Sequence, residues 1–407
     1  MTSCINAIRS AIRSNDPYHL ASAFTLSISE ADSVHTNTNK SNHKRYSRGN
    51  IIDANGNDWS EITNIFLQAN DAAKSGDAIE AYTSHSTLHS KFNHLLTNSP
   101  GNILIPLLHT ICHNTYQSAI MADDQNSIRT GRNDHSRLQS AVTLLQESFS
   151  KTLNDRKEYM DGTPLSENGS KKVGVLYIVN LLFAMYFRLN TLRLCKNLLK
   201  PVEGRSLHIK GDNMGEKVTY RYYVGRLRMF EDNYKEAEEH LNYALEHCHK
   251  NAIANKKKIL NYLIPIKLER GRLPTLKLLE KFDLQEYMPL VTAIRCGDLR
   301  LFNDTLLKYQ DKFIRRGTYL LLEKCKTVCH RNLFKRIFVI LGKHQLPLLN
   351  MANAMKWLGM DIDLDEIECI LSNLIFRGYV RGYISHSKRI LVLSKRDPFP
   401  VAAVVKK

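Results

Sequence analysis

Residues 361–393 read DIDLDEIECILSNLIFRGYVRGYISHSKRILVL, and this stretch decides the fold of the C-terminal part of the chain. Asp363–Arg377 opens with acidic residues, which suit a helix N-terminus, and Gly378 after it suits a helix C-terminus. Two runs typical of strands follow at residues 379–384 and 389–393, separated by a segment of hairpin length. The stretch therefore predicts a helix followed by a small β-wing.

Two apolar helices are predicted before this stretch, at Arg331–Leu341 and Pro347–Leu358. Three helices and a terminal hairpin make a winged helix, so we assign residues 331–397 to that domain and residues 398–407 to an extended tail. The third helix is acidic at its front and apolar through its middle. A helix that reads DNA bases usually presents polar and basic residues there. We therefore expect binding by shape or charge, without base readout.

The region upstream is helical almost without interruption. Residues 221–248 read RYYVGRLRMFEDNYKEAEEHLNYALEHC, in which Gly225 and Ala237 lie where two antiparallel helices can approach closely, as in a tetratricopeptide hairpin. Weaker echoes of this pattern elsewhere predict an all-α fold, a TPR-like right-handed α-solenoid, with an ordinary helical bundle as the alternative. The remaining assignments are N-terminal helices and a polar linker (1–58), N-terminal helical repeats (59–212) and further helical repeats (213–330).

The net charge of +17 is unevenly distributed along the chain. Residues 1–150 carry 11 basic and 13 acidic groups, whereas residues 151–407 carry 46 and 27. Within residues 251–350 the counts are 20 and 8. This asymmetry favours a polyanionic partner such as nucleic acid, an acidic protein or an anionic membrane surface. A basic but inert surface is the alternative.

Two groups of cations are candidate binding residues. Lys388 and Arg389 lie at the predicted wing tip, where they can contact phosphates without reading sequence, and such binding weakens with salt. For any single lysine or arginine, a place on a solvated helix face or a pair with a carboxylate is a simpler explanation than a role in binding. The nucleic-acid-binding candidates are Arg377, Arg381, Lys388, Arg389, Lys395 and Arg396. The basic patch for an acidic partner or nucleic acid comprises Lys256, Lys257, Lys258, Arg270, Arg272, Arg315, Arg316 and Lys324.

Motifs for catalysis and for metal binding are missing or incomplete. The sequence has no GxxxxGK[ST], GxGxxG, HExxH or GxSxG. Two groups could hold a metal: Cys325, Cys329 and His330, and the His-Cys-His run at 247–249. Neither has a second ligand pair at zinc-site spacing, so we expect these residues to belong to the core instead. The acidic run at 361–366 lacks the glycine of a calcium loop and predicts a helix start. We assign no catalytic residue, no metal site and no cofactor.

The eight cysteines are scattered, which is typical of a reducing, intracellular compartment. The N-terminus lacks the apolar core of a signal peptide. The most apolar run, Val173–Phe187, is 15 residues long and contains Asn180, so it predicts a buried core helix instead of a membrane span. We expect a soluble protein with no membrane association.

Several stretches together resemble the PCI-domain family, in particular the branch of COP9 signalosome subunit 12-like proteins and PCI domain-containing protein 2. They are VTYRYYVGRLRMFEDNYKEAEEHLNYALEHCHKNAIANKKKIL (218–260), FIRRGTYLLLEK (313–324), RNLFKRI (331–337) and the segment 361–400 with its closing Pro-Phe-Pro. The likeness covers about residues 171–400, whereas residues 1–170 match only in helical layout.

The resemblance implies helical repeats that run into a winged helix, with residues 213–330 as the helical portion of the PCI domain. It implies a non-enzymatic scaffold that pairs with a second PCI-type subunit and with a small, acidic, disordered protein shared with the proteasome lid. It further implies a nuclear role, extending to the cytoplasm, in transcription-coupled mRNP assembly and mRNA export. RNA or DNA would be bound by wing positions that here hold Arg381, Lys388, Arg389 and Lys395. An accessory subunit of the COP9 signalosome is the alternative.

Overall fold

The computed structural model describes residues 8, 10, 12, 16–25, 59–99, 101–159, 165–166, 168–205, 207 and 213–400. The chain divides into two compact units, residues 1–223 and 224–407. Most of the N-terminal segment 1–58, with its predicted polar linker, and the last part of the tail, 401–407, lie outside the described residues.

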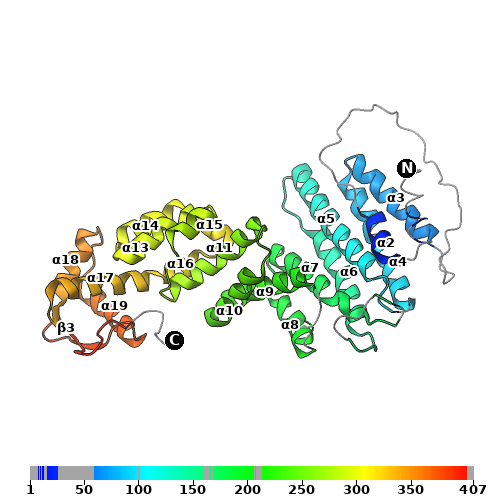
Figure 1. Cartoon of the computed structure of the whole chain (residues 1–407). Helices are drawn as coiled ribbons and strands as arrows, with labels where there is room; N and C mark the ends of the chain where they lie inside the picture. The colour runs from blue at the N-terminus through cyan, green and yellow to red at the C-terminus, as the bar shows by residue number, and fades with distance from the viewer. Residues whose placement is uncertain are drawn as a thin grey trace. The chain divides into compact units, whose positions relative to one another are not determined.

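The first unit is built from helices that pack against their neighbours in the chain (Figure 1). Its elements are α2 (Pro17–Ala23), α3 (Ser60–Lys74), α4 (Ala78–Asn98), α5 (Ile105–Thr130), α6 (Ser136–Leu153), η1 (Lys171–Gly174), α7 (Val175–Arg188), η2 (Leu192–Leu194), α8 (Cys195–Gly204) and the first part of α9 (Met214–Phe230). Each longer helix buries an apolar stripe, as Ile62, Phe66 and Ala69 do on α3. Short connections between packed helices make successive antiparallel hairpins.

Helix α7 contains the most apolar run of the sequence. Phe183, Met185 and Tyr186 are among its buried residues, so the prediction of a core helix is confirmed. Within the described part of the chain, no helix combines the length and the apolar character that spanning a membrane requires.

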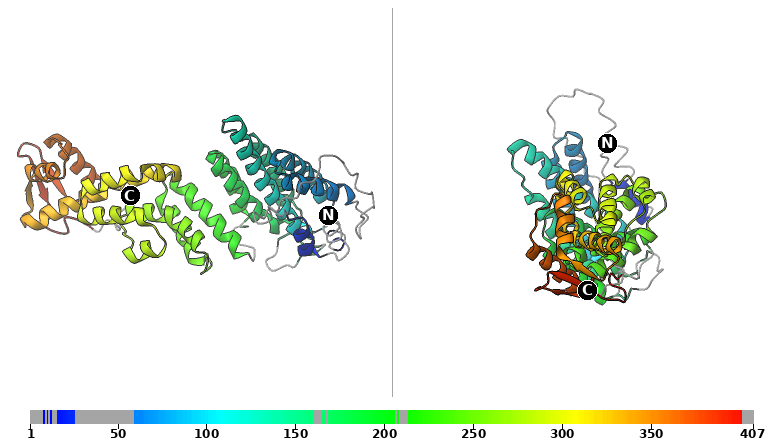
Figure 2. Two further views of the ribbon diagram at one scale, coloured as in Figure 1. Left: turned by 90° about the horizontal axis from the view of Figure 1, so that it is seen from above. Right: turned by 90° about the vertical axis from the view of Figure 1, so that its left-hand side faces the viewer.

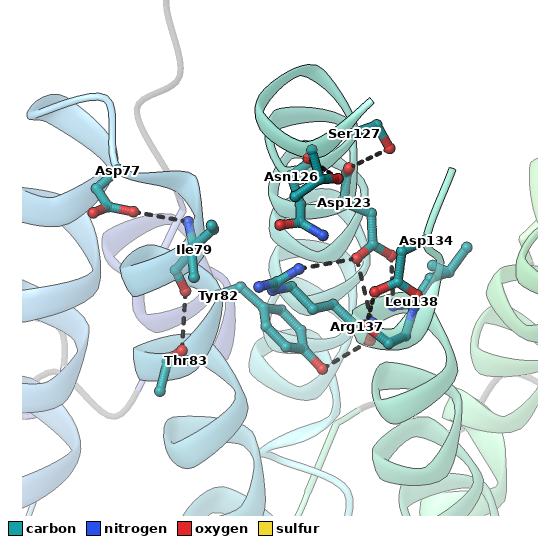
Figure 3. A network of polar contacts seen from close by, with 12 residues as sticks. Asp77, Ile79, Tyr82, Thr83, Asp123, Asn126, Ser127, Asp134, Arg137 and Leu138 are labelled. Atoms are coloured by element: carbon teal, nitrogen blue, oxygen red, sulfur yellow. Dashed lines mark hydrogen bonds and ion pairs between the residues drawn. The ribbon is translucent and has the colours of Figure 1, made fainter. Parts of the chain in front are cut away.

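Polar contacts join α4, α5 and α6 (Figure 3). The buried carboxylate of Asp123 on α5 accepts hydrogen bonds from the backbone N–H groups of Arg137 and Leu138, at 3.3 and 2.9 Å. It thereby satisfies donors that are free at the start of α6. The Tyr82 hydroxyl of α4 donates to the Arg137 carbonyl at 2.9 Å. The polar stretch at the end of α5 is helical as far as Thr130, and Asp123 within it has a role inside the unit.

A second polar network is buried in the core of this unit. The two ring nitrogens of His89 lie 3.0 Å from Thr115 Oγ1 and 2.8 Å from Ser148 Oγ, and Ser148 Oγ donates to Asn93 Oδ1 at 2.7 Å. One turn earlier, buried His85 has no hydrogen-bond partner for either ring nitrogen among the described residues. Burial lowers the pKa of His85 to about 4 and that of His89 to about 3. Both imidazoles are therefore neutral at pH 7.

The second unit begins within α9 and combines further helical hairpins with a small sheet (Figure 1). Its elements are α10 (Tyr234–His247), α11 (Ile253–Glu269), α12 (Leu276–Lys281), η3 (Gln285–Tyr287), α13 (Met288–Cys296), α14 (Leu299–Lys308), α15 (Gln310–Arg316), α16 (Tyr319–Lys324), α17 (Lys326–Leu341), β1 (Gln345–Pro347), α18 (Leu348–Trp357), α19 (Leu364–Phe376), β2 (Gly382–Ser385) and β3 (Ile390–Leu393).

Gly225 marks the contact between α9 and α10. A Cβ atom at this position would lie 2.7 Å from Cγ of Leu241 and 3.3 Å from the carbonyl oxygen of Ala237. Ala237 and Leu241 are fully buried, so the space cannot be enlarged without moving α10. The helical hairpin predicted at 221–248, with small residues at its contact, is confirmed.

Helices α17, α18 and α19 and the three strands form the winged helix. The strand order is β1–β3–β2 with both pairs antiparallel. Leu346, Leu391 and Leu393 are buried, so one face of the sheet closes the core over the helices. Figure 2 shows the strands, in red, beside the orange helices. The sequence did not predict β1, because three residues give no period and Pro347 suits a helix start.

The predicted boundaries of α19 hold. Asp363 Oδ1 accepts the backbone N–H of Glu366 at 2.7 Å, and the Glu366 carboxylate accepts that of Asp363 at 3.3 Å. This capping box confirms that the acidic run begins a helix. Gly378, with a φ of +75°, follows the helix end.

The start of the tail is fixed to α17. The buried Arg331 guanidinium donates to the carbonyl oxygens of Phe399 and Pro400, at 2.9 and 2.6 Å. The Phe399 ring lies 5.7 Å from that of Phe338. The predicted fold class, all-α helical repeats followed by a winged helix with a small β-wing, is confirmed, and the tail forms part of the second unit.

Candidate nucleic-acid interface

Half of the predicted cations are held in ion pairs, and half have none among the described residues. The paired cations are Lys257, Arg270, Arg272, Arg316, Lys324, Arg381 and Arg389. Within the described part of the chain, the cations without an ion pair are Lys256, Lys258, Arg315, Arg377, Lys388, Lys395 and Arg396. Of these, all except the half-buried Lys256 are exposed.

In the helical repeats, paired arginines surround buried carboxylates. Glu238 lies 3.2 Å from Arg270 and 2.9 Å from Arg272. Glu286 lies 2.7 Å from Arg316. Burial raises the pKa of Glu286, but hydrogen bonds from Arg316 and its neighbours outweigh burial and hold the pKa below its ordinary value. These arginines therefore stabilise the hairpins and present little free charge.

Other members of the repeat patch pair with exposed carboxylates. Lys257 lies 2.8 Å from Asp283, and Lys324 lies 2.8 Å from Asp232. Exposed pairs of this kind are weak and screened by salt, so both lysines can exchange partners. Lys257 and Lys324 therefore stay available to a polyanion, unlike the arginines around buried glutamates.

The wing tip carries less free charge than its sequence suggests. The Arg389 guanidinium lies 2.5 Å from Asp365 and 3.0 Å from Glu368, both on α19. His386 lies 2.8 Å from Glu368. Lys388 alone among the predicted tip cations extends without an ion pair in the described residues. The tip is thus bound back onto the acidic front of α19.

At the other end of the sheet, cations gather with one exposed aromatic ring. We call Phe376, Arg377, Arg381, Lys395 and Arg396 the basal cluster. Backbone hydrogen bonds hold the three loop cations together: Arg381 donates its N–H to Pro398 at 2.8 Å and accepts that of Ser394 at 2.8 Å. Among the described residues, the sole ion pair of this cluster joins Arg381 to Asp397 at 3.1 Å. The basal cluster therefore carries four cations against one paired carboxylate among the described residues.

Tyr379 connects the basal cluster with the helical repeats. Burial raises the pKa of this buried tyrosine, whereas Arg377, Arg331 and Arg270 act on it in the opposite direction. Arg270 at the end of α11 and Arg377 at the end of α19 thus both act electrostatically on Tyr379. One cation from each of the two predicted groups therefore influences the same buried side chain.

Phe376 was not among the predicted site residues. It is 91% exposed, the highest value among the large apolar residues of the described chain. The buried stripe of α19 runs through Ile367, Leu371 and Leu374, and Phe376 is off this stripe. Helical periodicity was the signal that could have identified Phe376 as a surface aromatic beside Arg377.

Further exposed apolar residues lie on the same domain. Trp357 on α18 is 80% exposed and Ile340 on α17 is 81% exposed. Arg300 donates to the Trp357 carbonyl at 2.8 Å, and Arg336 donates to the Cys296 carbonyl at 2.7 Å. Arg336 of α17 and Trp357 of α18 are thus hydrogen-bonded to residues on either side of the connection from α13 to α14. We call Ile340 and Trp357 the apolar pair.

Of the candidate metal ligands, the three cysteines lie in the core, whereas His247 and His249 are exposed, so the expectation of core residues is wrong for these two histidines. Cys325 and Cys329 are fully buried, and their thiols face the carbonyl oxygens of Leu321 and Ala293. Burial raises the pKa of Cys329 to about 12, so this thiol stays protonated. Among the described residues, no three His, Cys, Asp or Glu side chains are grouped to hold a metal ion.

Comparison with known proteins identifies relatives along most of the chain. The PCI domain matches residues 306–395. PCI domain-containing protein 2 from Xenopus laevis is 36% identical over 85% of this chain and 86% of its own. Enhanced ethylene response protein 5 from Arabidopsis thaliana is 34% identical over 84% and 81%. Protein CSN12 homolog from Mycosarcoma maydis is 32% identical over 81% and 76%. These matches extend beyond residues 171–400, so the likeness includes N-terminal helices.

Proposed function

The chain belongs to the PCI-domain family, in the branch of PCI domain-containing protein 2 and the CSN12 homologues, and from this membership we propose that it is a scaffold subunit of a nuclear complex for transcription-coupled mRNP assembly and mRNA export. PCI-domain proteins are generally non-catalytic scaffolds that assemble with other PCI-type subunits. In this proposal the chain binds a second PCI subunit, a small acidic disordered protein, and RNA or DNA.

The observation that carries the proposal is the excess of free cations on the second unit. Lys258 and Arg315 in the repeats, and Lys388, Lys395 and Arg396 in the winged helix, are exposed without an ion pair in the described residues. Free cations attract polyanions over a Debye length of about 8 Å at physiological salt. A disordered acidic protein can follow such a surface over a long distance and offset its ordering cost by many contacts.

The apolar pair supports a protein partner on the winged helix. Ile340 and Trp357 are at least four-fifths exposed, although burying them would be favourable. Tryptophan is enriched among the residues that dominate binding energy at protein interfaces, and arginines such as Arg300 and Arg336 commonly accompany it. A second PCI subunit that covers this pair would account for their exposure in the single chain.

A second candidate function is an accessory subunit of the COP9 signalosome. The similarity to the CSN12 homolog from Mycosarcoma maydis favours it. In this case the chain would contribute architecture to a complex that removes a ubiquitin-like modifier. The two candidates use the same fold and differ in their partners.

Tagged purification from cells, with identification of the bound proteins, tests the proposal. We expect a small acidic protein and a second PCI-type subunit, together with RNA-processing or transcription factors. A paired substitution, Ile340→Asp with Trp357→Ala, should release the PCI subunit. The matched control is Leu307→Ala, at another exposed apolar residue of this unit. Recovery of signalosome core subunits would favour the second candidate, and recovery of no acidic protein would contradict the first.

A further inference from the structure

We propose that the basal cluster is a site for single-stranded nucleic acid, in which Phe376 stacks on an unpaired base and the cations contact the flanking phosphates. This inference rests on the proposed function and deepens it, because it names the strand type and the residues. It also moves the site from the wing tip to the opposite end of the sheet.

The first argument is the placement of Phe376. The side chain is 91% exposed at the last residue of α19, while Leu374 and Tyr379 on either side are buried and supply the local packing. The helix end therefore does not need an apolar side chain at this position. A single exposed ring is ordinary on a protein surface, but a ring next to several cations is the combination that binds single strands.

The second argument is the charge around the ring. Arg377 follows Phe376 directly, and Arg381, Lys395 and Arg396 lie on the adjoining loops. Asp397 is the sole carboxylate paired with these cations among the described residues. Arg377, Lys395 and Arg396 are thus free to contact phosphates on both sides of a stacked base, and Arg381 is held only in an exposed, exchangeable pair.

The third argument excludes a duplex held in the usual manner of a winged helix. The front of α19 would enter the groove, but Asp363, Asp365 and Glu366 lie there and are exposed. Phosphates near these carboxylates would be repelled. Arg389 cannot compensate, because Asp365 and Glu368 already hold it. In addition, Phe376 can stack only on a base whose face is free, which a duplex interior does not offer.

Full-length protein and fluorescent 15-nucleotide probes test the inference. Anisotropy titrations would use oligo(U) RNA, oligo(dT) DNA and a duplex of equal length, each at several salt concentrations. We expect both single strands to bind more tightly than the duplex. A clear preference between the two single strands identifies RNA or DNA as the natural ligand.

Phe376→Ala should weaken single-strand binding about fivefold or more, the loss typical of one stacked base, and Phe376→Trp should restore it. Tyr18→Ala is the matched control, since Tyr18 on α2 is another exposed aromatic residue to which no binding role is assigned, and it should leave affinity unchanged. Lys395→Glu with Arg396→Glu should weaken binding and reduce the salt slope by about one to two. Lys388→Glu should have the smaller effect.

The outcomes separate this inference from the proposed function. If the chain binds no nucleic acid, the nucleic-acid part of the proposed function fails and the inference fails with it. If the chain binds RNA and Phe376→Ala binds equally well, only the basal site is overturned. Equal affinity for the duplex overturns the single-strand assignment. If polyglutamate displaces the probe from the wild type and from Phe376→Ala equally well, the cluster is a site for acidic protein and the inference is wrong.

Discussion

The buried carboxylate of Glu286 accepts a hydrogen bond from the Arg316 guanidinium at 2.7 Å, across 30 residues of sequence. Arg316→Met would leave that carboxylate with Lys312 alone, at 3.1 Å, so we expect the free energy of unfolding to fall by about 3–5 kcal/mol. Urea denaturation measures this change. Arg315→Met, at the exposed neighbour, is the control and should stay within about 0.5 kcal/mol of the wild type. Equal stability of the two variants would contradict the structural role.

The contact of Gly225 with Leu241 predicts a cost for a single methyl group. Gly225→Ala should lower the free energy of unfolding by about 1–2 kcal/mol, because overpacking exceeds the gain in helix propensity. Gly204→Ala on α8 is the control, since nothing lies within 4 Å of its added methyl group, and it should be neutral or slightly stabilising because only the gain in helix propensity remains. Leu241→Ala makes room for the methyl group, so the cost of Gly225→Ala should shrink in that background. An unchanged cost would show that crowding at Leu241 is not the cause.

The elements fixed by local chemistry could be predicted from sequence. The capping residue Asp363 and the glycine at 378 mark both ends of α19, and Gly225 with Ala237 marks a close helix contact. Strand β1 could not be predicted, because its three residues become a strand only by pairing with β3, about 45 residues later in the chain. Such pairing leaves no local signal.

The sequence could predict which cations the site contains, but not which of them are held in ion pairs. Sequence places Arg389 at the wing tip, and the turn that carries it forms as expected. Its pairing with Glu368 depends on how the wing folds back on α19, over 21 residues of sequence. The same holds for Arg272 and Glu238, which are 34 residues apart. Counting lysines and arginines therefore identifies a basic domain, while the fold decides which of them stay free.

The neutral histidines of the first unit predict a loss of stability in acid. Burial lowers the pKa of His85 to about 4, against an ordinary value of 6.5, so the unfolded chain binds a proton more readily than the folded one. The stabilisation of the folded state by neutral His85 is complete above pH 6.5 and is lost as the pH falls toward 4. For His85 alone the full effect is about 3 kcal/mol.

Urea denaturation at pH 7 and pH 4.5, followed by the fluorescence of buried Trp59, measures this dependence. His85→Leu should make the profile shallower by the part that His85 contributes, because leucine cannot bind a proton, while buried His89 keeps the remainder. His94→Leu, at an exposed histidine on the same helix, is the control and should keep the wild-type profile. A His85→Leu profile as steep as that of the wild type would assign the acid sensitivity to other groups.

The buried Arg331 makes stability depend on the tail. Deleting residues 398–407 removes the carbonyl oxygens of Phe399 and Pro400 that accept its hydrogen bonds, and it leaves a buried cation without these partners. We expect a loss of about 1–3 kcal/mol by thermal or urea unfolding. Arg331→Met should destabilise the full-length chain but should restore part of the stability of the truncated chain, because the unpaired charge is then gone. This change of sign distinguishes a hydrogen-bonding role from simple packing by Phe399, for which the two losses would add.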